Sequence, residues 1–279
     1  MTTVALTASL SEAPRHKEAS GVMKDQYRKF YDQLAEDVLD RGSRTSTLRD
    51  FLHRYWDMRE IDVVRRLIRV NTEGYVLDVA CGPGRWIIEY ASQGPQVIGI
   101  DISPKMIKLA KSKMQKIHNT DFVCGDAENM PFRNDVFDVV SCFDAFGGFP
   151  HPVKSLREMK RALKKEGILV VEPTNILSLM GIFIATVRQF YCLFRKFLKR
   201  NLELAWYDRW TRYEFPTRFT SWLQTVGLTY KMIGVNILPT LPHRSLLDVL
   251  LRIERELEKH TIFNVLGYRL IFICNRGHT

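Results

Sequence analysis

The stretch that decides the fold reads Val76-Leu77-Asp78-Val79-Ala80-Cys81-Gly82-Pro83-Gly84-Arg85-Trp86. Its apolar first half predicts a strand, its Gly-x-Gly segment predicts a tight turn, and the residues after Gly84 predict a helix. The two glycines let the backbone pass close to a bound molecule, because no Cβ stands in the way. Dinucleotide-binding turns have a third glycine three positions after the second, where this chain has Ile87. A pyrophosphate would therefore be poorly accommodated.

Short apolar runs alternate with amphipathic helical patterns around this turn. Strands are predicted at Tyr75–Ala80, Gln96–Asp101, Asp121–Cys124, Val136–Cys142 and Ile168–Glu172. Helices are predicted near 84–93, 104–117 and 152–165. This alternation is typical of an α/β fold, a doubly wound and mostly parallel sheet covered on both faces. Ligands of such sheets bind beyond the carboxyl ends of the strands.

Further elements are predicted on both sides of this region. Helical patterns precede it, near 25–38 and 48–70, and residues 1–20 are polar and aperiodic, as in a flexible tail. After it we expect helices at 176–200, 216–226 and 245–259 and strands at 228–235 and 268–274. The sheet would then hold seven strands, with N-terminal helices and helical insertions in the C-terminal part.

Composition narrows the classes of protein. The chain has 279 residues, 46% hydrophobic and 26% charged, which excludes a disordered or collagenous polymer. Its five cysteines form no Cys-x-x-Cys pair, so neither disulfides nor a zinc site are expected. This cysteine usage favours a reducing, cytoplasmic compartment. We expect no secretory signal and no membrane-spanning helix. The net charge of +10 makes phosphate-rich partners or an anionic membrane worth testing.

Acidic residues follow two further strands. Asp101 ends the second strand, where a carboxylate can accept hydrogen bonds from both hydroxyls of a ribose. Alternatively Asp101 caps the next helix, a role that Ser103 could fill instead. Asp126 and Ala127 follow the third strand and could read an adenine edge, or form an ordinary Asp-rich turn. All three strands end at one crevice, and so does the fourth, which runs into Phe143.

Together these segments resemble a known family. They are Leu77-Asp78-Val79-Ala80-Cys81-Gly82-Pro83-Gly84, Gly99-Ile100-Asp101, Gly125-Asp126-Ala127-Glu128-Asn129-Met130-Pro131-Phe132 and Phe137-Asp138-Val139-Val140. The set is similar to class I S-adenosylmethionine-dependent methyltransferases, of the small-molecule type that includes the ubiquinone and menaquinone C-methyltransferases. The resemblance covers about 73–175 and implies a cofactor-binding core there. It is weak over 1–50 and 176–279.

The resemblance implies S-adenosylmethionine as cofactor. The residues implied to bind it are Asp78, Ala80, Gly82, Gly84, Asp101, Ile102, Asp126, Ala127 and Phe143. In the family, the position of Asp78 holds the methionine ammonium, and the backbone from Ala80 to Gly84 lines the methionine and the ribose. Ala80 replaces a glycine, and we expect a negative φ there, which tolerates its methyl group.

The other positions carry over in the same way. Asp101 would hold the ribose, with Ile102 against the adenine face. Asp126 and Ala127 would read the adenine edge, and Phe143 would close the methionine end. We expect Asp101→Ala to weaken cofactor binding while changing stability little, because a solvent-facing crevice is expected at Asp101.

The resemblance also implies a domain organisation for the chain. The resemblance implies a single methyltransferase domain over 21–279. Its acceptor-side helices and cap would lie at about 21–70 and 176–260.

No catalytic residue is assigned from the sequence. A general base is needed only if the acceptor must lose a proton. The candidates are His151, Asp144, Tyr27 and Tyr31. A surface or capping histidine and two core tyrosines are the structural alternatives. No group of His, Asp and Glu has the spacing of metal ligands, so no metal is expected.

The leading hypothesis is methyl transfer to a small, lipophilic acceptor such as a lipid, a quinone or an isoprenoid-like compound. One alternative is methylation of RNA or protein, which the +10 charge alone supports. Nucleic acid is not favoured, because the basic stretches at 105–116 and 154–165 contain no interleaved aromatics. The alternative of another class is an inactive cofactor-binding or partner-binding module.

The segment Ile176–Arg200 combines a wide apolar stripe with cations and no acidic residue. The cations are Arg188, Arg195, Lys196, Lys199 and Arg200. This composition is typical of a helix in a membrane interface, where each cation near an anionic leaflet adds about 1 kcal/mol. A cap helix over the substrate pocket explains it as well. Both interpretations stay open and are compatible, since a cap helix could also contact a membrane. The expectation is a cytoplasmic protein that can be peripheral on a membrane.

Overall fold

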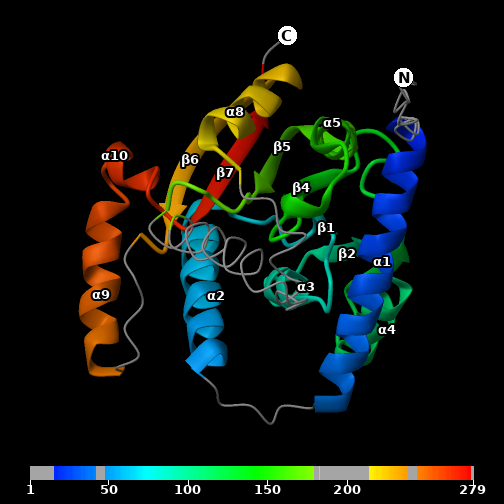
Figure 1. The fold of residues 1–279 in the computed structure, drawn as a ribbon, viewed down its shortest axis with the longest axis horizontal. Coiled ribbons are helices and arrows are strands. Elements are labelled where there is room, and N and C mark those ends of the chain that lie inside the picture. Colours follow the sequence, from blue (N-terminus) through cyan, green and yellow to red (C-terminus); the bar gives the residue numbers. More distant parts are fainter. Residues whose placement is uncertain (1–15, 42–47, 179–181, 183–213, 238–243, 278–279) are drawn as a thin grey trace, which may run out of the picture.

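The computed structural model describes residues 16–41, 48–178, 182, 214–237 and 244–277. Within these ranges, seven strands form one sheet in the order β3-β2-β1-β4-β5-β7-β6 (Figure 1). The strands are β1 (Tyr75–Val79), β2 (Gln96–Asp101), β3 (Thr120–Cys124), β4 (Phe137–Cys142), β5 (Leu163–Val171), β6 (Leu228–Val235) and β7 (Arg269–Arg276). Strands β1 to β5 are parallel, and β7 runs antiparallel to both β5 and β6. The predicted mostly parallel sheet is confirmed.

The strand order reverses between β1 and β4, and this reversal positions the site. From β1 the sheet continues to β2 and β3 on one side, and to β4 and β5 on the other. At such a point the connections leave neighbouring strands toward opposite faces of the sheet. A crevice therefore opens beyond the carboxyl ends of β1 and β4.

Successive residues of the strands face two large apolar cores within the described ranges. On β1, Val76 packs on the face covered by α2 (Leu48–Leu67), α3 (Arg85–Ala91) and α4 (Pro104–Lys113). Leu77 packs on the other face, against α5 (Pro152–Ala162) and α8 (Pro216–Thr225). Because strand side chains alternate between faces and both faces are covered, the strands read as unbroken apolar runs in the sequence.

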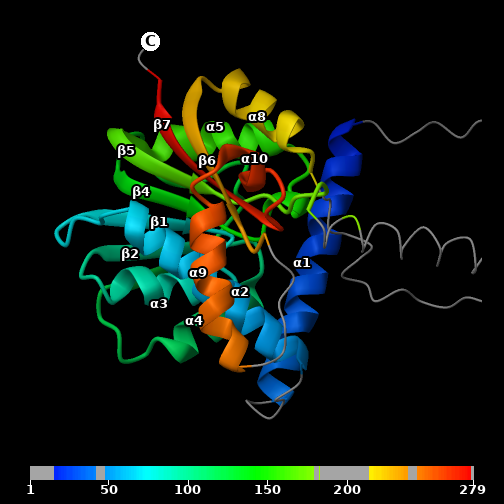
Figure 2. The same ribbon diagram turned by 90° about the vertical axis from the view of Figure 1, so that its left-hand side faces the viewer.

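Three further helices pack around this sandwich. Helix α1 (His16–Arg41) packs its Ala35 against Met106 and Leu109 of α4. Helix α9 (Arg244–Leu257) lies in front of α2 in the view of Figure 2, and ion pairs join the two. Helix α10 (Thr261–Asn264) comes just before β7. Helix α1 thereby lies over the carboxyl end of β2, because α4 begins there.

Several predicted boundaries are wrong; the helix predicted at 104–117, for example, ends at Lys113. Helix α1 begins at His16, so 16–20 do not belong to a tail; Lys17, Glu18 and Ala19 are good helix formers, which the search for apolar periodicity missed. Helix α5 ends at Ala162, and β5 begins at Leu163, so Lys164 and Lys165 lie on a strand and not on the predicted 152–165 helix. Leu163 is already extended and pairs with Phe137 of β4. This tertiary pairing overrides the helix propensity of the Lys-Lys-Glu sequence.

The predicted membrane-facing segment, Ile176–Arg200, lies outside the described residues except for 176–178 and 182. Among the helices that the structure describes, none combines the length and the apolar character needed to cross a bilayer.

Candidate functional site

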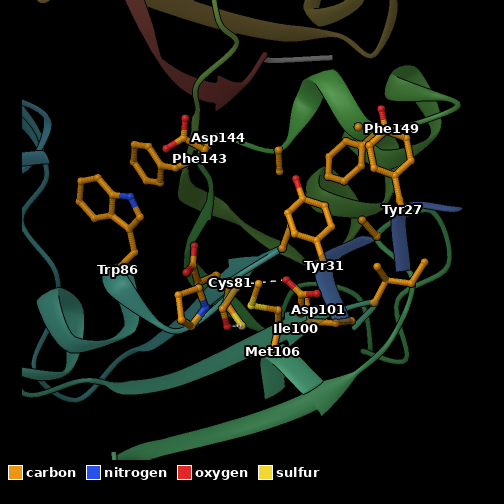
Figure 3. Close-up of a pocket in the computed structure, with 18 of the residues that line it drawn as sticks. Tyr27, Tyr31, Cys81, Trp86, Ile100, Asp101, Met106, Phe143, Asp144 and Phe149 are labelled. Carbon is orange, nitrogen blue, oxygen red and sulfur yellow. Dashed lines mark hydrogen bonds between the residues drawn. The ribbon is translucent and has the colours of Figure 1, made fainter. Parts of the chain in front are cut away.

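A cavity of about 450 Å³ lies at the carboxyl ends of β1, β2 and β4 (Figure 3). Its walls come from α1, from the turn after β1, and from the segments that follow β2, β3 and β4, with Asp57 of α2 and Arg269 of β7 at its edge. The volume falls in the range of pockets that hold small molecules or cofactors. Eight of the nine predicted cofactor-binding residues line it: Asp78, Ala80, Gly82, Asp101, Ile102, Asp126, Ala127 and Phe143.

Gly84 is the predicted residue that the cavity lining does not include. Its φ is +88°, and it is the residue from which α3 starts. A Cβ at this position would clash with the side chain of Met114. Gly84 is therefore required by backbone conformation and by the packing of α3 against α4.

The turn after β1 is wound in left-handed conformations. Gly82 has a φ of +51°, and Ala80 has a φ of +58°. The negative φ expected for Ala80 is therefore wrong. A left-handed conformation costs a residue with a Cβ about 1–2 kcal/mol, so this turn carries strain at Ala80.

Asp101 braces this turn from the next strand. Its Oδ2 accepts a hydrogen bond from the Gly82 N–H at 2.9 Å, and its Oδ1 accepts from the Ser103 N–H at 2.9 Å. Ser103 itself caps α4, since its Oγ accepts from the Met106 N–H at 3.0 Å. Asp101 is only 7% exposed, so the expectation of a solvent-facing position is wrong. Burial raises the pKa of Asp101, and its backbone hydrogen bonds partly oppose this shift.

Asp78 lies on β1 at the floor of the same cavity. The Ser141 hydroxyl donates to its Oδ1 at 2.8 Å. Burial raises the pKa of Asp78 to about 7, while Ser141 and the charge of Arg85 act in the opposite direction. A cationic group placed beside this carboxyl would favour its ionised form.

The acidic turn after β3 is held by a residue that the sequence analysis missed. Lys24 of α1 forms ion pairs with Asp126 at 2.6 Å and with the buried Glu128 at 2.7 Å. Burial lowers the pKa of Lys24, but its hydrogen bonds to the two carboxylates outweigh that effect, so the pKa is raised. Lys24 also lines the cavity, so α1 closes it near Asp126.

Aromatic rings form the far end of the cavity. Phe143 stacks on Trp86, with ring centroids 3.9 Å apart and an interplanar angle of 15°. Figure 3 shows this pair on one side of the cavity, with Tyr27, Tyr31 and Phe149 on the other. The Trp86 indole N–H is buried and has no hydrogen-bond partner among the described residues. The Phe143–Trp86 side therefore offers apolar ring faces, with an unused donor in its wall.

Three of the four candidate bases lie at the cavity, and one does not. Asp144, Tyr27 and Tyr31 line the cavity, whereas His151 does not. The His151 ring is largely exposed at the start of α5, with Nδ1 3.3 Å from Glu128 Oε2. The surface interpretation therefore holds for His151. The Tyr27 hydroxyl donates to the Gly147 carbonyl at 3.2 Å.

Beside the aromatic end lies a cluster of charged groups that the sequence did not reveal. Arg269 of β7 contacts Asp144, lies 2.8 Å from Glu172, and places its Nε 3.0 Å from Glu60. Arg85 donates to Glu60 at 2.9 Å and contacts Asp57. Carboxylate oxygens of Glu60, Asp144 and Glu172 lie within 4.8 Å of one another, a metal-like grouping. The guanidinium of Arg269 occupies its centre as the counter-charge.

Sequence comparison places the chain among methyltransferases. A family model described as "Methyltransferase domain" matches residues 77–171. The chain is 34% identical over 176 residues to a demethylmenaquinone methyltransferase of Listeria monocytogenes serotype 4b (strain CLIP80459), an alignment that covers 59% of this chain and 74% of that protein. It is 31% identical over 178 residues to a demethylmenaquinone methyltransferase of Staphylococcus carnosus (strain TM300), covering 60% of this chain and 70% of that protein.

Solved structures agree on the fold. The magnesium protoporphyrin IX methyltransferase of Synechocystis PCC 6803 with bound SAH has a TM-score of 0.65 at 17% identity, covering 91% of this chain and 100% of that one. The [4+2]-cyclase SpnF has a TM-score of 0.60 at 17% identity, covering 92% and 97%. At such identities the likeness establishes the fold alone, since one fold hosts different chemistries.

Proposed function

Because the chain belongs to the class I S-adenosylmethionine-dependent methyltransferases, we propose that it methylates a small, lipophilic acceptor. The observation that carries this proposal is the set of aromatic walls of the cavity, with Phe143 and Trp86 on one side and Phe149 on the other. Apolar walls favour an acceptor that leaves water with little loss of hydrogen bonds. Relatives that are demethylmenaquinone methyltransferases support a quinone-type compound.

The cavity fits the cofactor at its other end. Asp101 offers a buried carboxylate at the end of β2, where it would bind the ribose hydroxyls while holding Gly82. Asp78 would face the methionine ammonium, whose charge favours the ionised carboxyl. Ile102 would lie against the adenine, and Asp126 and Ala127 would read its edge.

The turn and the aromatic end complete this assignment. Ala80 and Gly82 would line the methionine and ribose, with Gly84 supporting the turn from outside the cavity. Phe143, stacked on Trp86, would close the methionine end. When bound, S-adenosylmethionine supplies a methyl group on a good leaving group. The chain therefore contributes mainly positioning and exclusion of water.

We further propose a single methyltransferase domain over 21–279, in which about 21–70 and 176–260 face the acceptor. Tyr27 and Tyr31 of α1, which line the cavity, support the first of these assignments. The alternative of an RNA or protein substrate has the net charge of +10 as its support. An inactive binding module would have the same cavity but would transfer no methyl group.

Transfer of a radioactive methyl group from S-adenosylmethionine decides between these functions. Reduced demethylmenaquinone, total RNA and a protein extract serve as acceptors in parallel reactions. We expect label in the quinol fraction alone. Label in RNA or protein instead would overturn the lipophilic acceptor, and no transfer to any acceptor would favour the binding module.

The cofactor assignment is tested at Asp101. Asp101→Ala removes two hydrogen-bond acceptors, so S-adenosylmethionine binding should weaken by about 2–3 kcal/mol in calorimetric titration. The fold should also lose about 1–3 kcal/mol in urea unfolding, because the Gly82 and Ser103 N–H groups lose their partner. Asp121→Ala, at an exposed aspartate of β3, is the control. Unchanged affinity in Asp101→Ala would overturn the ribose assignment.

We also propose that Ile176–Arg200 contacts an anionic membrane surface, on the strength of its composition. The full chain should sediment with phosphatidylglycerol vesicles at low salt and less with phosphatidylcholine vesicles. A variant with Arg195, Lys196, Lys199 and Arg200 changed to Gln should lose this binding. If the wild type stays in the supernatant with both vesicles, the segment does not bind the membrane.

A further inference from the structure

Asp144 has a left-handed backbone conformation and lies at the wall of the cavity. Its φ is +56°, a left-handed conformation that aspartate tolerates better than most residues but that is still uncommon. It directly follows Phe143 after β4, and its side chain lines the cavity beside that ring (Figure 3). Strained backbone at a cavity wall is a common mark of a functional residue.

Two guanidinium groups fix the Asp144 carboxylate. Its Oδ1 contacts Arg269, and its Oδ2 lies 3.5 Å from Arg85. Both arginines are themselves anchored by Glu60, which is fully buried. Asp144 remains 37% exposed, so its carboxylate is held from behind and accessible from the cavity.

The charges facing Asp144 come from every element packed around it. They are Asp57 and Glu60 of α2, Arg85 of α3, Glu172 after β5 and Arg269 of β7. Burial and the neighbouring Glu60 raise the pKa of Glu172 well above the ordinary carboxyl value. Four carboxyl groups, those of Asp57, Glu60, Asp144 and Glu172, therefore share the two guanidinium groups of Arg85 and Arg269. Because acidic groups outnumber cations, a proton added to the cluster relieves repulsion between the carboxyl groups.

We propose that Asp144 is the catalytic base, and that the acceptor carries a hydroxyl group whose hydrogen bond to Asp144 orients it for methylation. This proposal rests on the methyl transfer proposed above. Of the other candidates, His151 lies outside the cavity. Tyrosine hydroxyls ordinarily have a pKa near 10, so at neutral pH they are protonated and accept a proton poorly. Asp144 is accessible from the cavity, and its carboxylate is held in place by two guanidinium groups.

The reaction balances without a further reactant. The O–H bond of the acceptor breaks, and its proton moves to the Asp144 carboxylate. The electron pair left on oxygen forms the new bond to the methyl carbon, directly or through a conjugated ring carbon. The methyl–sulfur bond breaks with its pair returning to sulfur. After methylation at a ring carbon, that carbon loses its own proton to water, and the acceptor oxygen takes back the proton held by Asp144. After methylation at oxygen, Asp144 releases its proton to water.

Asp144→Asn tests the proposal in the full chain, because asparagine keeps the shape and tolerates the same φ. With reduced demethylmenaquinone as the probe, kcat/KM at pH 7 should fall by about 10²-fold or more. S-adenosylmethionine affinity, measured by calorimetry, should stay within about twofold of the wild type, because Asp144 faces the acceptor. Asp144→Gly, unstrained at this φ, repeats the test if the asparagine variant does not fold.

Two variants serve as matched controls. Asp135→Asn changes another left-handed aspartate, with a φ of +58°, which pairs with Arg276 at 2.8 Å and does not line the cavity. Its activity should equal that of the wild type. Asp57→Asn removes the other cluster carboxylate that lines the cavity, and it should cost much less than Asp144→Asn. An equal loss in Asp57→Asn would overturn the assignment, because the charge of the cluster and not Asp144 would then matter.

A pH profile separates proton transfer from positioning. The deficit of Asp144→Asn should shrink between pH 7 and pH 9, because the acceptor hydroxyl increasingly ionises without help. A deficit that is constant with pH would overturn the catalytic role. So would activity within threefold of the wild type, or a matching loss of cofactor affinity. Failure of the proposed function is distinct, since the wild type itself would then transfer no methyl group to this probe.

Discussion

Ala80 keeps a methyl group where the backbone favours glycine. Its φ of +58° costs more than the flexibility that glycine would add to the unfolded chain. Ala80→Gly should therefore stabilise the fold by about 0.5–1 kcal/mol in urea unfolding. Ala162→Gly, at the last residue of helix α5, should instead destabilise by about 1 kcal/mol. If both variants lose stability, the turn is not strained at Ala80.

Asp78 should make cofactor binding depend on pH. Its pKa of about 7 in the free protein means that half the molecules carry the charge near neutrality. An ammonium group binds the ionised form, so the Kd for S-adenosylmethionine should fall about tenfold between pH 6 and pH 8. Asp78→Asn cannot titrate at this position, so its profile reports the contribution of the ligand's own ionisation, which is then subtracted. Parallel profiles in calorimetry would contradict the assignment.

The raised pKa of Asp78 also makes the stability of the fold depend on pH. Because burial raises the pKa of Asp78 in the folded state above its unfolded value near 4, the folded protein holds this proton more tightly. The resulting stabilisation is complete below pH 4 and is lost as the pH rises through about 7. Urea unfolding of the wild type should therefore show stability falling across this window, relative to Asp78→Asn.

At the scale of elements, one hydroxyl joins helix α4 to helix α1. The Ser103 Oγ accepts from the Met106 N–H and donates to Asp32 of α1 at 2.6 Å. Ser103→Ala should cost about 1–2 kcal/mol, because α4 loses its cap. It should also speed hydrogen exchange in α1. Ser112→Ala, where the hydroxyl only bonds back to the Leu109 carbonyl of the same helix, should change stability by less than about 0.5 kcal/mol.

At the scale of the whole molecule, the N-terminal and C-terminal parts meet in a buried ion pair. Arg59 of α2 is 1% exposed and binds Glu254 of α9 and Glu258 just after it. Arg59→Leu deprives these carboxylates of their cation and should destabilise the protein by about 3 kcal/mol at pH 7. Arg255→Leu, which removes an exposed pair with Asp62, should cost less than about 1 kcal/mol. Equal losses in thermal unfolding would contradict a role for burial.

The sequence by itself determined the sheet and which strand ends meet at the cavity. Strand positions follow from short apolar runs, and in a parallel sheet every carboxyl end lies at one edge. Asp78, Asp101, Asp126 and Phe143 could thus be placed at one crevice from their positions along the chain, and the structure brings all four to one cavity.

The tertiary structure alone decided how these groups are held. Arg269, Glu60 and Glu172 lie far apart in the chain and meet only because β7 inserts beside β5. The same is true of Lys24 and its carboxylates, which α1 brings together across the cavity. Ion pairs of this kind leave no local pattern, because burial and partner depend on elements that are distant in sequence. The backbone at Ala80 and the burial of Asp101 are set by the packed turn for the same reason.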